Sequence, residues 1–248
     1  MNIILSPTYH ELLPFIQQLP QLFDHQGVTI YQKRNTVKVL AYNTLQLNVK
    51  KYHTPISINK IVYSTGIRKP KGLRAYQYAA TLLKNNISTP EPVAYIENRK
   101  HGLINDSYLV TIQLDNRYTL YEIPQMTPEQ YTPIADALGK YTAEMHQKNI
   151  LHKDYSPGNI LFQQNNNQYN FTIVDINRMY FGHVSTKKGL RNLRKLWGTK
   201  DFFTLVVKAY AKQRNINTQK AVEFALNERK KFWKKYSKKH QIPFQLQY

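Results

Sequence analysis

The chain has 248 residues, which is enough for one medium-sized domain or for two small lobes with a sizeable core. It contains no cysteine, which excludes a disulfide scaffold and thiolate metal sites and favours a reducing compartment. The formal net charge of +20 should attract polyanions such as nucleic acid, anionic lipid or phosphorylated glycans. Most of this charge lies near the C-terminus, since residues 183–248 carry 17 lysines and arginines against 3 acidic residues.

The N-terminal segment has the apolar run Ile3-Ile4-Leu5, followed by serine and proline. Such a run is too short for the core of a signal peptide, and no later run approaches the length of a membrane-spanning helix. The sequence therefore predicts a soluble, cytoplasmic protein.

Strands are expected in the first part of the chain. Residues 28–52 are rich in β-branched and aromatic types and alternate in places, which predicts a small antiparallel sheet. Apolar residues at helical spacing predict a helix over 73–85, and the TPEP sequence at 89–92 ends it. Further strands are expected at 93–96 and 108–114.

Helices dominate the second part of the chain. Apolar residues on one face predict a helix over 128–145, and the pattern is again helical from about residue 190. Short strands at 160–162 and 171–174 flank an Asn/Gln-rich tract, which is typical of a β-hairpin.

This order of elements predicts an α+β fold of two unlike lobes with a cleft between them. The N-terminal lobe is expected at residues 1–107 and should be β-rich with one long helix. A larger, mostly helical C-terminal lobe at 108–248 would carry the hairpin and the loop before it.

The sequence HKDYSPGN at 152–159 supplies that loop. Its residue types are ordinary loop formers, so the loop by itself says little. Asp175, however, ends the second hairpin strand and should lie beside Asn159, where a carboxylate and a carboxamide oxygen suit Mg²⁺ shared with phosphates. Asp154 would face the same cleft and accept a proton from a substrate. His-x-Asp-x-x-x-x-Asn followed by a strand-terminal Asp is the catalytic half of the protein-kinase-like phosphotransferases.

An enzyme of this kind needs a lysine on an N-terminal strand to hold the nucleotide phosphates. Lys50 ends the predicted strand 47–50 and fits that role. A lysine at a strand end is common in a chain with 35 basic residues, and what favours Lys50 is its position before the helix and the second lobe.

The chain resembles the lipopolysaccharide kinases, the family of Kdo and core-heptose kinases, whose fold is that of the protein kinases. The resemblance covers roughly residues 28–197. Five stretches carry it: VKKYH at 49–53, RKPKGLRAYQYAATLL at 68–83, TPEPVAYIE at 89–97, ILHKDYSPGNILF at 150–162 and VDINRMYF at 174–181. The Asp-x-Asn-Arg form of the last motif favours this family over the protein kinases, which have Asp-Phe-Gly there. Aminoglycoside-type phosphotransferases would not predict the TPEPVAYIE and INRM sequences.

This resemblance implies transfer of the γ-phosphoryl group of ATP, bound in the cleft with Mg²⁺, to a hydroxyl of an inner-core sugar of lipid A. It makes Asp154 the base, Asn159 and Asp175 the Mg²⁺ ligands, and Lys50 the phosphate anchor. It also makes His152 a packing residue of the loop. Arg178 could brace Asp175 or the loop, or be solvated. Which sugar and which hydroxyl accept the phosphate is left open.

Two departures from the family leave a weak enzyme or a pseudokinase open. The glutamate that pairs with the strand lysine is replaced by Gln77, which could still orient Lys50 through a hydrogen bond without charge assistance. The loop expected to cover the nucleotide, residues 32–36, has no glycine, so the side chains of Arg34 or Lys33 would contact the phosphates.

The basic C-terminal region interleaves cations with aromatics, as in Phe232-Trp233-Lys234-Lys235-Tyr236. This composition suits anionic headgroups and predicts a peripheral protein on the cytoplasmic face of the inner membrane, with nucleic acid the less favoured partner. Alternatively, these aromatics are the core of a packed amphipathic helix. Two other functions compete with the glycolipid kinase: a non-catalytic kinase-fold scaffold on membrane or RNA, and a kinase acting on a protein or an antibiotic.

Overall fold

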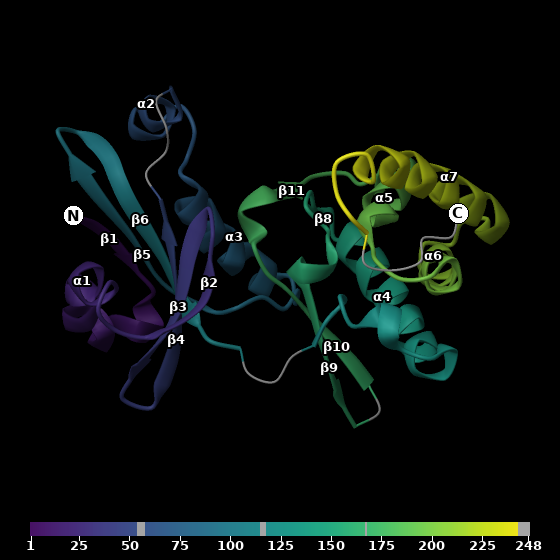
Figure 1. The fold of residues 1–248 in the computed structure, drawn as a ribbon, viewed down its shortest axis with the longest axis horizontal. Helices are drawn as coiled ribbons and strands as arrows, with labels where there is room; N and C mark the ends of the chain where they lie inside the picture. Colours follow the sequence, from purple (N-terminus) through teal and green to yellow (C-terminus); the bar gives the residue numbers. More distant parts are fainter. Residues whose placement is uncertain (54–57, 115–117, 167, 243–248) are drawn as a thin grey trace. The chain divides into compact units, whose positions relative to one another are not determined.

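The computed structural model describes residues 1–53, 58–114, 118–166 and 168–242. The chain divides into two compact units, Met1–Asp115 and Asn116–Tyr248, the first built on a sheet and the second mostly helical (Figure 1). This confirms the predicted α+β class. The predicted boundary after residue 107 falls inside a strand that pairs along the first sheet, so the division lies at the end of that strand instead.

The first unit contains a six-stranded antiparallel sheet in the order β1-β5-β6-β4-β3-β2. The strands are β1 (Asn2–Leu5), β2 (Val28–Gln32), β3 (Asn35–Tyr42), β4 (Leu45–Tyr52), β5 (Pro92–Lys100) and β6 (Leu103–Ile112). The strands predicted at 28–52 and 93–96 are confirmed. The strand predicted at 108–114 is the second half of β6, which begins at Leu103, and β1 was missed because a four-residue strand is too short to show alternation.

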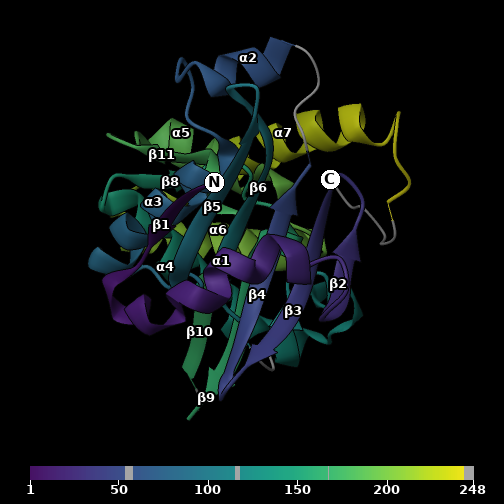
Figure 2. The same cartoon turned by 90° about the vertical axis from the view of Figure 1, so that its left-hand side faces the viewer.

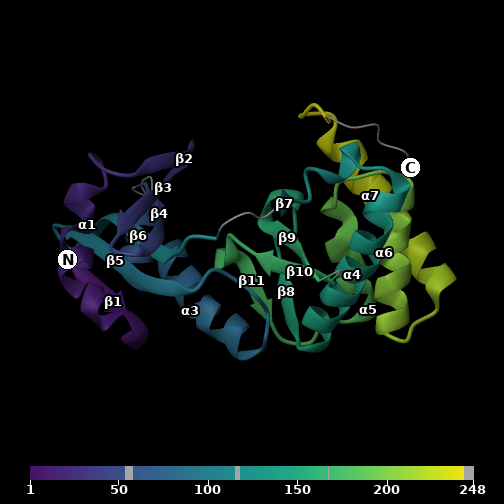
Figure 3. The ribbon, with the colours of Figure 1, turned by 90° about the horizontal axis from the view of Figure 1, so that it is seen from below.

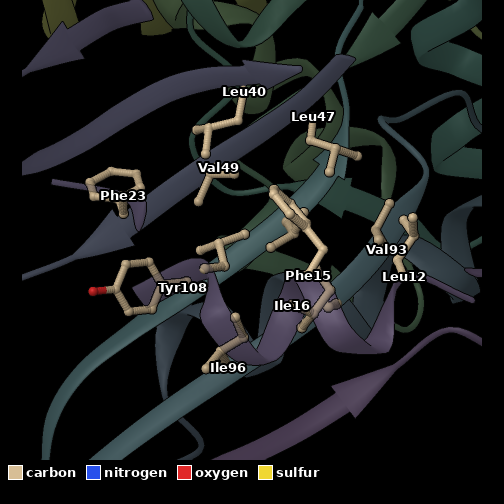
Figure 4. Packing of buried hydrophobic residues seen from close by; sticks show 13 residues of the cluster. Leu12, Phe15, Ile16, Phe23, Leu40, Leu47, Val49, Val93, Ile96 and Tyr108 are labelled. Atoms are coloured by element: carbon tan, nitrogen blue, oxygen red, sulfur yellow. The ribbon is translucent and has the colours of Figure 1, made fainter. Parts of the chain in front are cut away.

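One face of this sheet is covered by the N-terminal helices, a 3-10 helix (Pro7–Leu12) and α1 (Leu13–Leu22) (Figure 2). Figure 4 shows Phe15 and Ile16 packed among strand residues that include Val49 and Ile96. Val49 and Ile16 are completely buried, and each such side chain contributes roughly 1.5–3 kcal/mol to the stability of the fold.

The opposite face carries Lys50 and Tyr52, because side chains along a strand alternate between faces. The described residues of the unit also form α2 (Ile58–Ser64) and α3 (Lys71–Lys84), and α3 lies within a residue or two of the helix predicted at 73–85. α3 begins against this face, where a Cβ at Gly72 would meet the rings of Tyr52 and Tyr95. The glycine therefore allows α3 to lie close to Tyr52.

In the second unit, the long helices α4 (Pro128–Gln147) and α6 (Lys200–Gln213) lie side by side (Figure 3). They approach closely at Gly139, where a Cβ would collide with the backbone oxygen of Val206. α5 (Thr186–Asn192) and α7 (Thr218–Tyr236) complete the helical part. The helix predicted at 128–145 is confirmed, and the helical pattern expected from about residue 190 to the end is confirmed as far as Tyr236, with residues 243–248 outside the described part of the chain.

Two small sheets of the second unit position the HKDYSPGN loop. One contains the predicted hairpin, β9 (Ile160–Asn165) and β10 (Gln168–Ile173), with the short β7 (Tyr118–Thr119) at its edge. The other pairs β8 (Ile150–His152) with β11 (Met179–Phe181). The loop runs from β8 to β9, and the Asp175 segment runs from β10 to β11. One end of each segment is therefore fixed by the first sheet and the other end by the second.

Within the part of the chain that the structure describes, no helix combines the length and the apolar character needed to cross a bilayer.

Candidate active site

His152 fixes the start of the HKDYSPGN loop. Its Nε2 donates to the carbonyl oxygen of Val174 at 3.0 Å, and its Nδ1 accepts from the backbone N–H of Asp154 at 3.0 Å. The side chain is completely buried, and this burial lowers the pKa of the imidazole, so the neutral tautomer with the proton on Nε2 fits both bonds. This is the geometry of a buried packing histidine, as we expected from the sequence.

Asn159 and Asp175 lie on neighbouring ends of the hairpin. The backbone N–H of Val174 donates to the Asn159 carbonyl oxygen at 3.0 Å, which places Asp175 one residue from the strand position opposite Asn159. The Asn159 side chain uses its Nδ2 to donate to the Asp154 carbonyl oxygen at 2.9 Å. Because Nδ2 makes this bond, Oδ1 is the atom of the Asn159 side chain that could bind a metal.

Asp175 has a left-handed backbone conformation, with φ of 53° and ψ of 44°. Aspartate tolerates this region better than most residues, and here it turns the chain from β10 into the 3-10 helix Ile176–Arg178. The buried Asn177 donates its Nδ2 to Asp175 Oδ1 at 2.7 Å. This bond holds one carboxylate oxygen in place.

These two side chains fit a magnesium ion. A carboxylate and a carboxamide oxygen are hard ligands, and Mg²⁺ is usually held by one or two such groups and takes the rest from water and phosphates. Among the described residues, no three His, Asp or Glu side chains gather as a candidate metal site. The oxygens of Asn159 and Asp175, completed by those of the substrate phosphates and water, would therefore suit Mg²⁺.

The Asp154 carboxylate lies between two cations. Lys195 Nζ is 2.7 Å from Oδ1, and Arg178 Nη1 is 3.7 Å from Oδ2. Arg178, for which the sequence left three roles open, thus lies against the loop acid. Sequence reasoning missed Lys195, which is 41 residues beyond Asp154 and one of many lysines near the C-terminus.

A series of hydrogen bonds between buried and half-buried side chains supports the loop. His146 of α4 bonds the Tyr210 hydroxyl through Nδ1 at 3.0 Å and Asn192 Oδ1 through Nε2 at 3.3 Å. The Asn192 side chain then donates to the His152 carbonyl oxygen at 2.9 Å. Burial lowers the pKa of His146 to about 3, so this histidine stays neutral at physiological pH.

We expect the free energy of unfolding to fall as the pH decreases below the ordinary histidine pKa of about 6.5. The histidines of the unfolded chain are then protonated, whereas the buried His146 of the folded protein stays neutral down to about pH 3. His146 should contribute a slope of about 1.4 kcal/mol per pH unit, and His152, whose pKa is also lowered, adds to it in the same direction. Urea denaturation at pH 7 and pH 5 measures this slope.

His146→Gln should reduce the slope, because it removes the buried imidazole whose pKa is lowered. An unchanged slope in His146→Gln would contradict this account of the buried histidine.

Lys50 lies beside Tyr52, with its Nζ 5.3 Å from the centre of the tyrosine ring, at a distance where the cation and the ring attract each other. Gln77 of α3 accepts a hydrogen bond from Lys69 Nζ at 2.9 Å. Its Oε1 is therefore already bonded to a different lysine from the one we expected it to orient. Arg34 is exposed at the turn between β2 and β3.

The sequence matches the profile of the lipopolysaccharide kinase (Kdo/WaaP) family over residues 25–235. None of the curated proteins matches it. Among solved structures, the fold is similar to that of WaaP in complex with acyl carrier protein, at 13% identity and a TM-score of 0.65, over 97% of this chain and 100% of that one. It is also similar to a microcompartment-associated aminopropanol kinase, at 10% identity and a TM-score of 0.50, over 91% of this chain and 98% of that one.

At these identities the structural likeness shows the fold alone, a kinase fold. The family match is broader evidence, because it covers most of the chain and includes the loop, the hairpin and the strand that carries Lys50. The chain therefore belongs to the lipopolysaccharide kinase (Kdo/WaaP) family of phosphotransferases.

Proposed function

We propose that this protein transfers the γ-phosphoryl group of ATP to a hydroxyl of an inner-core sugar, Kdo or heptose, of lipopolysaccharide. The observation that carries the proposal is the arrangement of Asp154, Asn159 and Asp175 around one hairpin, in a chain of this family. A base and two oxygen ligands close together on a fixed backbone are what phosphoryl transfer requires.

Each residue has a role in this proposal. Asp154 accepts the proton of the sugar hydroxyl and orients its oxygen for attack on phosphorus. Asn159 and Asp175 would hold Mg²⁺, which when bound neutralises the charge of the transferred phosphates. Lys50 anchors the nucleotide phosphates, and Arg34 makes a second contact with them. Gln77 on α3 stands where the family has the glutamate that orients this lysine. Because the acid, the amide and the lysine are all present, we favour an active kinase over a non-catalytic scaffold.

The test is phosphate transfer from ATP to defined acceptors, followed by mass measurement of the product. Kdo-lipid A and heptose-bearing inner core should gain one phosphate each if their sugar is the substrate, and their comparison identifies the sugar. A protein substrate and an aminoglycoside, assayed in parallel, represent the other kinase classes. ATP consumption that no acceptor stimulates would refute the glycolipid proposal, and failure to bind ATP would favour the scaffold.

We also propose that the protein works as a peripheral protein on the anionic cytoplasmic face of the inner membrane. The support is the exposed row of lysines on α7: Lys230, Lys231, Lys234 and Lys235. The aromatic part of our expectation is only partly met, since Trp233 is buried while Phe232 and Tyr236 are half-buried. Trp233 therefore belongs to the packed side of the helix and the lysines to its exposed side.

Binding to anionic vesicles should depend on these four lysines. Each lysine near an anionic surface contributes roughly 1 kcal/mol, so replacing all four by glutamine should release most of the bound protein. Sedimentation with anionic and neutral vesicles at low and high salt measures this, because salt screens such attraction. A control variant removes four exposed lysines elsewhere: Lys84, Lys100, Lys208 and Lys212.

Equal loss of binding in the control would mean that net charge, not the α7 row, is responsible. Binding that ignores lipid charge would contradict the membrane proposal. The α7 lysines would then serve a partner protein instead, as acyl carrier protein is bound in the WaaP structure.

A further inference from the structure

Asp154 and Lys195 form the closest charged pair around the loop. Their 2.7 Å contact is between side chains that are 30% and 27% exposed, whereas Arg178 is 59% exposed and 1.0 Å more distant. Partial shielding from water strengthens the pair relative to an exposed one, although solvent still screens it. Lys195 is therefore the main positive charge at the loop acid, and Arg178 is an outer one.

The loop itself supplies no cation after Asp154. The four residues between Asp154 and Asn159 are Tyr155, Ser156, Pro157 and Gly158. Lys153 precedes the acid, and its Nζ lies 5.8 Å from the centre of the Tyr180 ring. The positive charge that meets the Asp154 carboxylate thus comes from a distant part of the chain.

The segment that carries Lys195 is firmly held on both sides. Lys195 ends the 3-10 helix Leu193–Lys195, and both Leu193 and Leu196 are completely buried. On the N-terminal side, Asn192 donates to the His152 carbonyl oxygen at 2.9 Å, so the segment is joined to the loop at a second point.

On the C-terminal side, the buried Arg229 of α7 donates to the carbonyl oxygens of Leu196 and Gly198. Its guanidinium also lies 4.6 Å from the centre of the Phe203 ring. A lysine on a loose surface segment would lose backbone entropy as well as side-chain entropy on pairing, whereas here the backbone is already fixed and only the side chain is ordered. The contact with Asp154 is built into the fold.

We propose that Lys195 is a catalytic residue, which contacts the phosphoryl group during transfer while it holds Asp154 Oδ1. This inference rests on the proposed kinase function. The attacking hydroxyl must lie within hydrogen-bond reach of the base, at Oδ2, and the phosphorus must lie next to that hydroxyl oxygen. A lysine has three N–H donors, so one can remain on Oδ1 while another reaches a phosphoryl oxygen.

In this step the acceptor oxygen forms a bond to the γ-phosphorus, and the bond between that phosphorus and the oxygen bridging to the β-phosphate breaks. The electron pair of the broken bond stays on ADP, and the hydroxyl proton passes to Asp154. Lys195 remains protonated throughout and stabilises the negative charge on the transferred oxygens, as fixed cations do in phosphoryl transfer.

Replacing Lys195 by methionine, which keeps the length of the side chain without its charge, should lower kcat by about 10²–10³-fold, as for the loss of one transition-state donor. The KM values for ATP and acceptor should change little, because the contact forms during transfer. Lys195→Arg should recover part of the rate. Lys140→Met is the matched control, since it breaks a lysine–aspartate pair of the same 2.7 Å length on α4, and it should leave kcat unchanged.

A second measurement separates contact with phosphate from the mere positioning of Asp154. Binding of Mg²⁺-ADP with aluminium fluoride, measured without acceptor, should weaken in Lys195→Met by a factor comparable to the loss of kcat, while binding of Mg²⁺-ADP alone should not. If the aluminium fluoride complex binds as tightly as in the wild type, Lys195 only positions the base and the proposal is wrong.

Melting temperatures identify a variant that fails to fold, and Lys195→Gln then takes the place of the methionine variant. A wild type that binds the nucleotide complex but transfers to no sugar would overturn the proposed acceptor alone. In that case the binding comparison still decides whether Lys195 contacts the phosphoryl group. A wild type that binds neither nucleotide complex would overturn both proposals.

Discussion

Asp175→Asn should abolish Mg²⁺-dependent phosphoryl transfer, lowering kcat by at least about 10³-fold, without unfolding the protein. The change keeps the size of the side chain and removes the negative charge that would hold the metal, so the loss should equal or exceed that of one transition-state donor. The left-handed backbone at residue 175 is compatible with asparagine, so the fold should persist. Turnover and thermal melting are measured on the same preparation.

Neighbouring variants sharpen this result. Asn159→Ala removes the second proposed ligand and should also be severely impaired. Asn177→Ala removes only the amide that donates to Asp175 Oδ1, and should cost about 10–100-fold, as for other groups that orient a metal ligand. Asp136→Asn, at an exposed ion pair on α4, is the control and should be fully active. Normal turnover in either Asp175→Asn or Asn159→Ala would refute the metal assignment.

Lys50→Met should reduce kcat/KM by at least about 10²-fold, the scale of losing one charged contact to the nucleotide phosphates. Lys51→Met is a close control on the same strand. Lys51 points to the opposite face of the sheet, where its Nζ pairs with Asp24 at 3.1 Å, so its replacement should leave the kinetics unchanged. Steady-state kinetics at varied ATP measure both variants.

Gln77→Glu should hold or raise kcat if residue 77 stands where the family has its glutamate. In the structure Gln77 bonds Lys69, so a carboxylate there would be shared between Lys69 and any lysine brought near it.

Equal effects of the Lys50 and Lys51 substitutions would contradict the assignment of Lys50. A strongly harmful Gln77→Glu would show that residue 77 does not occupy the position of the family's glutamate.

The sequence by itself determined the helices, the strands and the hairpin, because these elements depend on residues that are close together in the chain. The alternation of 28–52 and the helical spacing of 128–145 follow from which face of each element is buried, and both elements formed as predicted. The hairpin was also predicted, although its strands are longer than expected, since β9 continues to Asn165 and β10 begins at Gln168, within the Asn/Gln-rich tract. The spacing of Asn159 and Asp175 around this hairpin was therefore enough to predict that they lie side by side.

Contacts between distant segments were decided by the tertiary structure. Nothing local distinguishes Lys195 from the other 34 lysines and arginines, and it meets Asp154 only because Asn192 and Arg229 fix the segment around it. In the same way, the lysine-rich run around Trp233 left open whether this side chain packs in the core or faces a membrane, and the tertiary structure buries it. A local pattern fixes which face of an element is apolar, whereas the partner of a single charged side chain depends on how elements far apart in the chain pack together.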